Sequence, residues 1–571
     1  MGRVCWVSVA VVFFVLGALL LTAGLVVELS VFNSIVHSSM KKQKVLGLND
    51  DGTLNDFTKE WAFPNYISTM NYYTFDYKNT IGVMNRAMYP DMIEKGPYVY
   101  RETLINSNIG FSDDGNNMTF SQATQYNFDP INSCPTCDPY NDTVTIPDIS
   151  FTLAMNAIED ILHNLKANEY KIHDDCIALL PKASALCNRL DTIIDDTISL
   201  IERETGVLMD LFGVSPFVTV TVDQLIYSGY ETPLVSNLVN RIVDIVNMAI
   251  HNNTLSYVQP ILVALNPANG TTDFLYVVDT GKQDYQKSGF TLSFTNTTMN
   301  GAISNGTTLP LNWWPSGSFD NTTCGVNDGA HALLIEGTNA DYFQSFIKKT
   351  DNLPIYVEDL CRSVRLSYEK DVTVKGIDGY RFVLPSTEFD YTRSENCGFC
   401  NTLQYGAYDL NASSPCMPTG LLDISNCQQG SPILISKPHF YQADKRVSGF
   451  VPRFRPTYDN DETTIDIEPI TGTVLAANKK LQINMFMNQW PHTAAYSVIR
   501  PGAYPLIWLN EQFLIDKGTV DQLNGQLFLP KKIIAIICWT AVGVGGALMV
   551  LSLVILFVQF CVNPKAEKKD D

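Results

Sequence analysis

The chain has 571 residues and a formal net charge of -20; 46% of its residues are hydrophobic and only 17% are charged. Soluble domains average about 25% charged residues, and this apolar composition excludes a disordered or collagen-like protein. The acidic balance also argues against nucleic acid as the partner, because binding to phosphates needs a clustered Lys and Arg surface.

Uncharged apolar runs at the two ends predict transmembrane helices at residues 4–27 and 533–562. At 1.5 Å per residue, each run can cross the roughly 30 Å hydrocarbon core of a bilayer. The first run is longer than the apolar core of a cleaved signal peptide, and charged residues after the second do not fit a glycolipid-anchor signal. Residues 1–3 and 563–571 are then short cytosolic tails, and residues 28–532 form one extracellular or lumenal ectodomain.

Cysteines and glycosylation sequons support this topology. Ten of the 13 cysteines lie between the spans, an even set that is typical of a disulfide framework in an oxidising compartment. They are Cys134, Cys137, Cys176, Cys187, Cys324, Cys361, Cys397, Cys400, Cys416 and Cys427. Eight N-x-S/T sequons also fall between the spans and predict a glycosylated ectodomain. They stand at Asn117, Asn141, Asn252, Asn269, Asn296, Asn305, Asn321 and Asn411.

Within the ectodomain, the period of the apolar pattern changes along the chain. Residues 54–102 alternate aromatic and polar side chains, which predicts strands with a turn at Gly96-Pro97. Residues 151–212 repeat apolar side chains at helical spacing and predict two amphipathic helices. Residues 219–227 predict a strand and residues 234–250 another helix, and the rest reads as short strands separated by turn residues. The fold class is therefore α+β.

The sequence carries no catalytic signature: a nucleophile elbow, a zinc-binding helix, a P-loop and a dinucleotide fingerprint are all missing. His163 and His173 could be ligands, but isolated histidines on surface helices are usually solvated. The pairs Cys134/Cys137 and Cys397/Cys400 have the spacing of zinc or redox sites, although an oxidising compartment favours disulfides. We therefore predict neither an enzyme nor a cofactor or metal.

One acidic pair offers an enzymatic alternative. Glu388 and Asp390 could form the two carboxyl groups of a glycosidase, but nothing in the sequence fixes their separation.

Three stretches carry a family resemblance. The first is EKGPYVYRE at residues 94–102, and the second is LCRSVRLSYEKDVTVKGIDGYRFVLP at residues 360–385. The third runs from GLLDISNC, ending at Cys427, through SKPHFYQAD at residues 436–444 to IDIEPITGTVLAANKKLQIN at residues 465–484. In order and spacing they resemble the class B scavenger receptor and lysosomal integral membrane protein family, which includes the fatty-acid translocase. The resemblance covers nearly the whole chain.

This resemblance implies a large antiparallel β-barrel ectodomain with a helical cap at residues 151–212 and an internal hydrophobic tunnel. A tunnel has a physical rationale, because each lipid CH₂ exposed to water costs about 0.8 kcal/mol. The implied disulfides are Cys324–Cys397, Cys361–Cys427 and Cys400–Cys416, with Cys134–Cys137 and Cys176–Cys187 as local additions. One departure is GVNDGAHALL after Cys324, where the family usually has an N-G-T-D turn and then F-P-P.

By the same resemblance, the expected function is a receptor that binds lipids or lipoproteins and passes apolar ligand through the tunnel to the membrane. Fatty acids, sterols and phospholipids are the expected ligands; the alternative is a lysosomal or endosomal receptor that holds a protein cargo on its cap. An oligomer formed through the cap or the spans is a further expectation. The candidate ligand-entry residues on the cap are Lys166, Lys171, Lys182 and Arg189, to which Arg203 is added. A comparable number of acids offsets them, so polyanionic particles are not the expected ligands.

The expected location is the plasma membrane or an endosomal or lysosomal membrane. The tail ends in Lys568-Lys569-Asp570-Asp571, which resembles a dilysine retrieval signal and leaves the early secretory pathway open. Cys5 and Cys561, near the cytosolic ends of the spans, are candidate palmitoylation sites. Gly543 and Ala547 are small residues four apart and are expected to let the two spans pack closely.

Overall fold

The computed structural model describes residues 2–64, 68–155, 195–196, 199, 207, 215–232, 236–237, 240–241, 243–244, 262–267, 269–271, 274–296, 302–303, 308–310, 313–314, 332–400, 416–428, 430–488 and 498–562. Most of the predicted cap at residues 151–212, most of the predicted helix at residues 234–250 and the tail at residues 563–571 lie outside these ranges.

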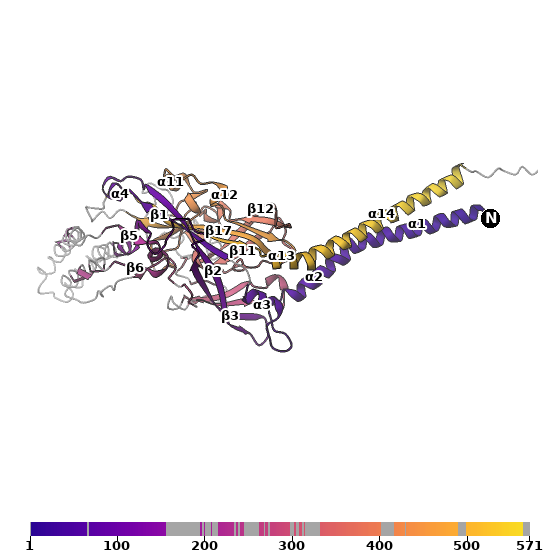
Figure 1. Cartoon of the computed structure of the whole chain (residues 1–571), viewed down its shortest axis with the longest axis horizontal. Coiled ribbons are helices and arrows are strands. Elements are labelled where there is room, and N and C mark those ends of the chain that lie inside the picture. The colour runs from indigo at the N-terminus through magenta and orange to yellow at the C-terminus, as the bar shows by residue number, and fades with distance from the viewer. Residues whose placement is uncertain are drawn as a thin grey trace, which may run out of the picture.

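The body of the molecule is one 14-stranded antiparallel sheet that curls into a barrel (Figure 1). Its first and last long strands, β1 and β18, are hydrogen-bonded neighbours. In sheet order the strands are β10 (Ala302–Ile303), β9 (Thr291–Asn296), β8 (Phe274–Asp279), β3 (Asn117–Phe128), β2 (Met92–Phe111), β1 (Ser68–Tyr77), β18 (Gly502–Leu514), β17 (Thr473–Met487), β16 (Thr464–Glu468), β13 (Ile377–Val383), β12 (Arg362–Val374) and β11 (Asn352–Val357), with β15 (Ile433–Ser436) on β17 and β14 (Leu422–Asp423) on β15.

A short segment at Gly337 and Thr338 bridges the two ends of this sheet. The Thr291 N–H of β9 donates to the Gly337 carbonyl, and the Tyr356 N–H of β11 donates to the Thr338 carbonyl, both at 2.8 Å. Gly337 has φ +84°, and a Cβ there would lie 1.9 Å from the Pro354 carbonyl oxygen, so only glycine fits. The segment makes the barrel nearly closed, which limits exposed strand edges.

The predicted turn at Gly96-Pro97 is wrong, because β2 runs straight through this pair. The Gly96-Pro97 peptide bond is cis, and the register between β1 and β2 shifts opposite it, between Tyr72 and Thr74. A Cβ on Gly96 would lie 2.6 Å from the Tyr72 carbonyl oxygen. A strand accommodates a proline where its register is irregular, because the missing N–H then breaks no ladder hydrogen bond.

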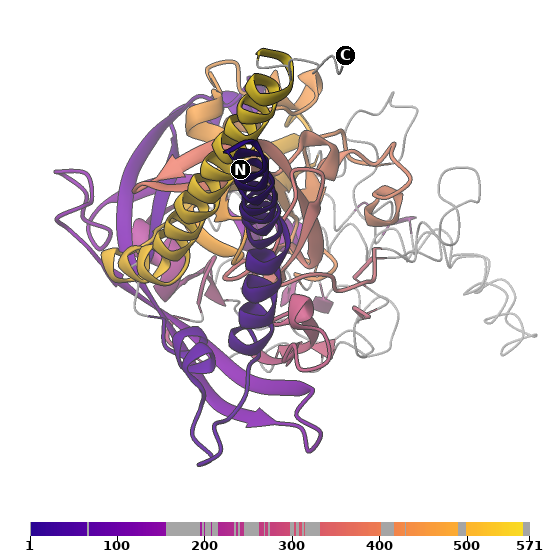
Figure 2. The ribbon, with the colours of Figure 1, turned by 90° about the vertical axis from the view of Figure 1, so that its right-hand side faces the viewer.

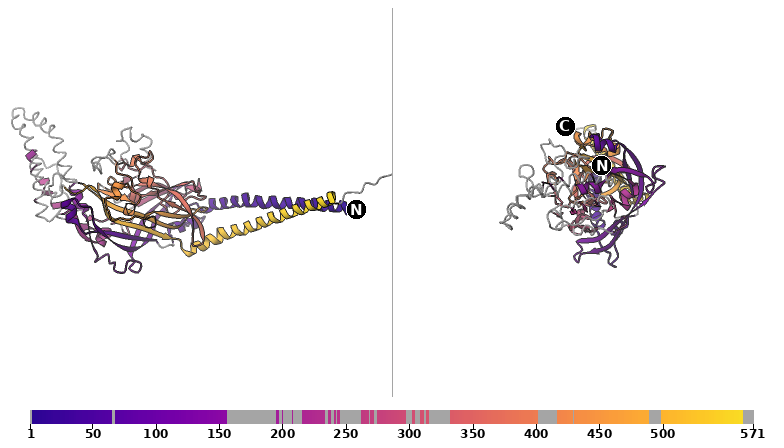
Figure 3. Two further views of the ribbon diagram at one scale, coloured as in Figure 1. Left: turned by 90° about the horizontal axis from the view of Figure 1, so that it is seen from above. Right: turned by 90° about the vertical axis from the view of Figure 1, so that its left-hand side faces the viewer.

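Two long helical rods leave the same end of the barrel and run side by side (Figures 1 and 3). The first consists of α1 (Gly2–Val26), the π-helical turn η1 (Val27–Val31) and α2 (Phe32–Gln43). The second consists of α13 (Lys517–Leu523), η9 (Asn524–Phe528), α14 (Leu529–Phe557) and η10 (Val558–Val562). Candidate membrane spans, by length and composition, are Trp6–Val26 and the segment within Lys517–Cys561.

Figure 2 looks at the barrel from this end, along the two helices. Glycines set the distance between them. A Cβ on Gly17 would lie 2.6 Å from the Gly545 carbonyl oxygen, and one on Gly24 would lie 2.7 Å from the Cys538 carbonyl oxygen. Backbones therefore touch at these two points, as small residues allow in membrane helices.

About two turns further from the barrel, the Ser552 hydroxyl donates to the Ala10 carbonyl at 2.7 Å. The contact residues are thus Ala10, Gly17 and Gly24 on α1 and Cys538, Gly545 and Ser552 on α14. Both series have a spacing of seven residues, as in coiled coils. The expectation for Gly543 is wrong: a Cβ there would meet nothing within 4 Å, because Gly543 lies away from the seam through Gly545.

Beside the barrel wall, the second resemblance stretch builds a buried ion pair. The Arg362 side chain is 1% exposed, and its Nη2 lies 3.2 Å from both Glu388 Oε2 and Asn396 Oδ1. The guanidinium also lies 3.5 Å from the centre of the Phe399 ring. Glu388, considered above as a catalytic acid, therefore holds Arg362, and its carboxylate is engaged in packing this wall.

Within the third stretch, residues 436–444 form an outer layer over β1. His439 lies in the short 3-10 helix η8 (Pro438–Phe440), and its ring contacts Phe75 of β1 edge to face, with the ring centres 5.9 Å apart. His439 Nδ1 lies 2.6 Å from Asp461 Oδ1, and Nε2 lies 2.7 Å from Glu94 Oε2. The carboxylates of Asp461 and Glu94 thus both contact the imidazole of His439, and the contact with Glu94 of β2 holds this layer against the barrel.

Two short two-stranded sheets lie at the end of the barrel opposite the two rods (Figure 1). β4 (Thr143–Pro147) pairs with β5 (Phe217–Thr221), and β6 (Tyr230–Glu231) pairs with β7 (Leu262–Val263). Strands β4 and β5, which flank the predicted cap in sequence, therefore lie at the end of the barrel farthest from the candidate spans.

Candidate functional site

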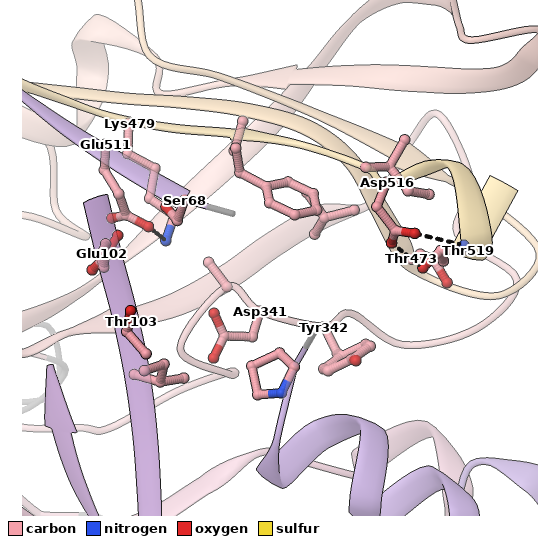
Figure 4. Close-up of a pocket in the computed structure, with 17 residues that line it drawn as sticks. Ser68, Glu102, Thr103, Asp341, Tyr342, Thr473, Lys479, Glu511, Asp516 and Thr519 are labelled. Carbon is pink, nitrogen blue, oxygen red and sulfur yellow. Dashed lines mark hydrogen bonds and ion pairs between the residues drawn. The ribbon is translucent and has the colours of Figure 1, made fainter. Parts of the chain in front are cut away.

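A cavity of about 150 Å³ lies at the end of the barrel from which the helices leave (Figure 4). Strands β1, β2, β17 and β18 form its wall, together with the loop around Asp341 and the start of α13. Its lining is Pro64, Ser68, Glu102, Thr103, Leu104, Ala340, Asp341, Tyr342, Thr473, Val474, Ala477, Lys479, Glu511, Phe513, Ile515, Asp516 and Thr519. Polar and charged side chains are a large share of this lining, so the cavity is not uniformly apolar.

The strand register explains why these side chains face one another. Ser68 of β1 pairs with Glu102 of β2 and with Phe513 of β18, and Phe513 pairs with Ala477 of β17. Residues that pair directly across antiparallel strands point to the same face. The next row on this face contains Lys479, which pairs with Glu511.

Lys479 is the centre of a group of charges on this inner face. Its Nζ lies 2.7 Å from Glu511 Oε1. Burial alone would lower the pKa of Lys479, but the negative charges of Glu511 and Asp341 raise it above its usual value. Lys479 is therefore positively charged at physiological pH.

The acids around it have raised pKa values. Burial, and then the charge of Glu511, raises the pKa of Glu102 to about 7. Burial raises the pKa of Asp341 in the same direction, against the attraction of Lys479. In the 3-10 helix η5 (Glu358–Leu360), burial and the charge of Asp359 raise the pKa of Glu358 to about 7.

Burial and the charge of Glu511 also raise the pKa of Asp359. We call these six side chains the carboxylate cluster: Glu102, Asp341, Glu358, Asp359, Glu511 and Lys479. Five carboxyl groups thus share one ammonium group, and near pH 7 some of them hold protons.

Two buried polar atoms on this face, a carboxylate oxygen and a hydroxyl oxygen, lack partners among the described residues. Glu102 Oε1 accepts from the Tyr126 hydroxyl at 3.4 Å, but the buried Glu102 Oε2 has no hydrogen-bond partner. Tyr100, two residues earlier on β2 and 2% exposed, has a hydroxyl without a partner. Buried polar atoms are normally paired, so unpaired ones mark a place where a ligand or water would bind.

Beyond this row, tyrosines continue toward the cap end. The Tyr227 hydroxyl donates to the Tyr72 hydroxyl at 3.3 Å, and the rings of Tyr72 and Tyr100 meet edge to face with centres 5.8 Å apart. Tyr126 lies beside them, with its ring centre 5.7 Å from that of Tyr227. The inner face is therefore amphipathic: aromatic faces alternate with hydroxyl and carboxyl groups.

The sequence analysis did not identify the carboxylate cluster. The alternation Tyr98-Val99-Tyr100-Arg101-Glu102 was a usable signal, because every second residue of a strand points to the same face. The separation between Lys479 and Asp341, by contrast, is set by strand register and loop position, which sequence spacing does not give.

The structure places the cysteines as follows. Disulfides join Cys134 to Cys137, Cys361 to Cys427, and Cys400 to Cys416. Cys397 is also disulfide-bonded, while Cys324, Cys176 and Cys187 lie outside the described residues. The two C-x-x-C pairs therefore differ: Cys134 bonds within its own pair, whereas Cys400 bonds outside it. Within the described ranges no three His, Cys, Asp or Glu side chains are grouped to hold a metal ion.

Other predicted sites are only partly described. Asn141 and Asn269 are exposed, Asn117 is half-buried at the start of β3, and Asn296 ends β9. The remaining sequons, at Asn252, Asn305, Asn321 and Asn411, lie outside the described ranges, as do Lys166, Lys171, Lys182, Arg189 and Arg203 of the cap. Cys561 is exposed and has a free thiol, and Cys5 lies in α1 with its side chain outside the description.

A nearly closed antiparallel barrel, with a cavity at the end where two apolar helices leave, defines a class of membrane protein anchored at both ends of the chain. The CD36 family model matches residues 15–556, and the chain belongs to the CD36 family.

Three relatives show the range of this family. An uncharacterized protein of Caenorhabditis elegans is 49% identical over 98% of this chain and 97% of its own length. Lysosome membrane protein 2 of Homo sapiens is 27% identical over 92% of this chain and 90% of its own. Scavenger receptor class B member 1 of Sus scrofa is 25% identical over 91% of this chain and 85% of its own. The chain is thus a scavenger-receptor-like membrane protein.

Proposed function

We propose that this protein is a receptor that binds lipids or lipoprotein particles and passes their apolar components through the barrel into the bilayer. The observation that carries the proposal is the cavity inside the barrel, directly beside the helices that lead into the membrane. The names of its relatives, a scavenger receptor and a lysosome membrane protein, are consistent with a receptor in the plasma membrane or in an endosomal or lysosomal membrane.

The proposal includes the topology and modifications expected from the sequence. Residues 28–532 lie outside the cell or in an organelle lumen, and the two tails are cytosolic. The eight sequons carry glycans, Cys324 bonds to Cys397, and Cys176 bonds to Cys187. Cys5 and Cys561 are palmitoylated, and the free, exposed thiol of Cys561 supports the modification at that residue.

Lipid retention by the full-length protein tests the proposal. The protein is purified in detergent, delipidated, incubated with fatty acids, sterols and phospholipids, and washed; mass spectrometry then measures what remains bound. We expect saturable retention of at least one lipid class. We also expect Ala477→Phe to reduce it, because a cavity of about 150 Å³ is close to the size that holds one benzene ring.

Ala476→Phe is the matched control, since Ala476 pairs with the exposed Leu514 on the opposite face of the same strands. Equal retention by both variants and the wild type would contradict passage through the cavity. If the wild-type protein retained no lipid at all, the alternative of a protein-cargo receptor that uses the cap would become the better account.

A further inference from the structure

We propose that the cavity at the membrane end of the barrel binds the ammonium group of an amine-bearing amphiphile, with the first carbons of its alkyl chain against the apolar part of the wall. This inference rests on the lipid-binding function proposed above and narrows it to one class of head group.

The first argument is charge. Of the carboxylate cluster, Glu102, Asp341 and Glu511 line the cavity, as does Asp516, and Lys479 is the cation that faces them. Lys479 is already engaged with Glu511 at 2.7 Å. A buried charge is costly unless it is paired, so a second cation in this cavity would be stabilised and a carboxylate head group would be repelled.

The second argument is hydrogen-bonding capacity. Glu102 Oε2 is a buried acceptor without a partner, and it belongs to a residue that lines the cavity. The partnerless Tyr100 hydroxyl is on the same face of β2, one row further from the membrane. A primary ammonium group has three donors and no acceptor; the Glu102 oxygen accepts and the Tyr100 hydroxyl can accept, so an ammonium group can donate to either of them.

The third argument is size and shape. A volume of about 150 Å³ admits a head group with a few carbons but not a whole lipid. Apolar side chains complete the wall beside the polar ones: Leu104, Val474, Phe513 and Ile515. An amphiphile that places its head at Glu102 therefore has an apolar surface for the start of its chain.

The protonation of the cluster is consistent with such a site. Burial raises the pKa values of Glu102 and Glu358 to about 7, so these groups share protons near neutral pH. A bound ammonium would favour their ionised forms and release protons. The groups that face Glu102 are Ser68 of β1, whose hydroxyl favours the ionised carboxylate, Glu511 of β18, Lys479 of β17, Asp341 of the loop and Tyr126 of β3. Glu358 and Asp359 of η5 belong to the same network. Amine binding should therefore strengthen as pH rises from 6 to 8.

Three probes with one chain length test the head group: dodecylamine, dodecanol and dodecanoate. Binding of each radiolabelled probe to full-length protein in nanodiscs is measured at pH 7.5, and binding to empty nanodiscs is subtracted. We expect dodecylamine to bind about tenfold more tightly than dodecanol, as one charge-assisted hydrogen bond would give, and dodecanoate to bind most weakly.

Two variants move in opposite directions if the site is correct. Glu102→Gln removes the open acceptor and should lower the affinity for dodecylamine about tenfold while leaving dodecanol unchanged. Lys479→Met removes the competing cation and should raise the affinity for dodecylamine. Glu60→Gln, an exposed carboxyl on α3 (Asp56–Ala62) at the same end of the barrel, is the control and should change neither.

The outcomes separate the two proposals. Equal binding of amine and alcohol, or preference for the carboxylate, overturns the ammonium site and leaves lipid binding intact. Equal loss of amine and alcohol binding in Glu102→Gln, with an unchanged circular dichroism spectrum, also overturns it, because Glu102 would then not distinguish the ammonium group from the hydroxyl group. Binding of none of the three probes to the wild type overturns both the ammonium site and the lipid-binding function on which it rests.

Discussion

Acidification should stabilise this protein through Glu102, and the effect can be isolated in one variant. The carboxyl group has an ordinary pKa of 4.5, and in the folded protein burial and the charge of Glu511 raise that pKa to about 7. The folded state therefore binds this proton more tightly than the unfolded state. Its contribution to stability is fully present below pH 4.5 and is lost as pH rises through 7.

The magnitude follows from the two pKa values. A difference between 4.5 and about 7, at about 1.4 kcal/mol for each pH unit, corresponds to about 3 kcal/mol. Glu102→Gln keeps the shape but cannot ionise. The variant should be about 3 kcal/mol more stable than the wild type at pH 8 and nearly equal to it at pH 4.5, because the wild-type carboxyl is then neutral in the folded state and only half ionised in the unfolded state.

Denaturant unfolding of the full-length protein in detergent, followed by near-ultraviolet circular dichroism at pH 4.5, 6 and 8, measures this difference. Groups outside the carboxylate cluster contribute equally to both proteins, so the free-energy difference between them reports Glu102 together with the carboxyl groups coupled to it. Glu60→Gln should track the wild type at every pH. A difference that is constant with pH, or that grows on acidification, would refute the assignment of Glu102 as a buried carboxyl with a raised pKa.

Three further predictions concern other parts of the molecule. Arg362→Met should destabilise the ectodomain by about 3–5 kcal/mol because it leaves the buried Glu388 carboxylate unpaired, and the midpoint of denaturant unfolding measures this. Gly545→Leu should force the two long helices apart, since even a Cβ there would lie 2.6 Å from the Gly17 carbonyl oxygen; the distance between spin labels on the two helices should increase, whereas Gly543→Leu should not change it. Burial alone would lower the pKa of His439, but hydrogen bonds to Asp461 and Glu94 raise it to about 9. The protonated histidine therefore stabilises the folded state fully below pH 6.5, and this stabilisation is lost as pH rises through 9. His439→Gln should reduce the difference between the denaturant midpoints of unfolding measured at pH 7 and pH 10.

The ends of the chain were predictable from the sequence because membrane insertion imposes a simple requirement of length and apolarity. The run at residues 4–27 contains the first candidate span, whereas the run at residues 533–562 covers only the later part of the second, Lys517–Cys561. The helices continue past both runs, from α1 into α2 and from α14 back into α13. Those extensions carry charged residues such as Lys41 and Lys531, so hydropathy could not find them. These segments are helical because they extend an existing helix, which is easier than starting a new one.

Residues that depend on register could not be read from the chain. Gly543 and Gly545 are both small residues within one helix, and only the docking of α14 on α1 decides which of them touches the partner. The same holds for the carboxylate cluster, whose members come from five separate segments between residues 102 and 511. The prediction of a turn at Gly96-Pro97 was wrong for a related reason. Glycine and proline are local turn signals, but here the pairing of β2 with β1 accommodates them through a shift in strand register.

The pairing of β1 with β18 fixes the order in which the molecule can be completed. Ser68 pairs with Phe513, and the two are separated by almost the entire ectodomain. At synthesis rates of about 5–20 residues per second, one edge of β1 waits roughly 20–90 s for its partner strand to be made. Throughout that interval the barrel is an open sheet held to the membrane by its first anchor alone. A chain that stops before residue 502 would therefore lack β18 as well as the second helical rod. The edge of β1 would then stay unpaired, and quality-control machinery would encounter that exposed strand edge.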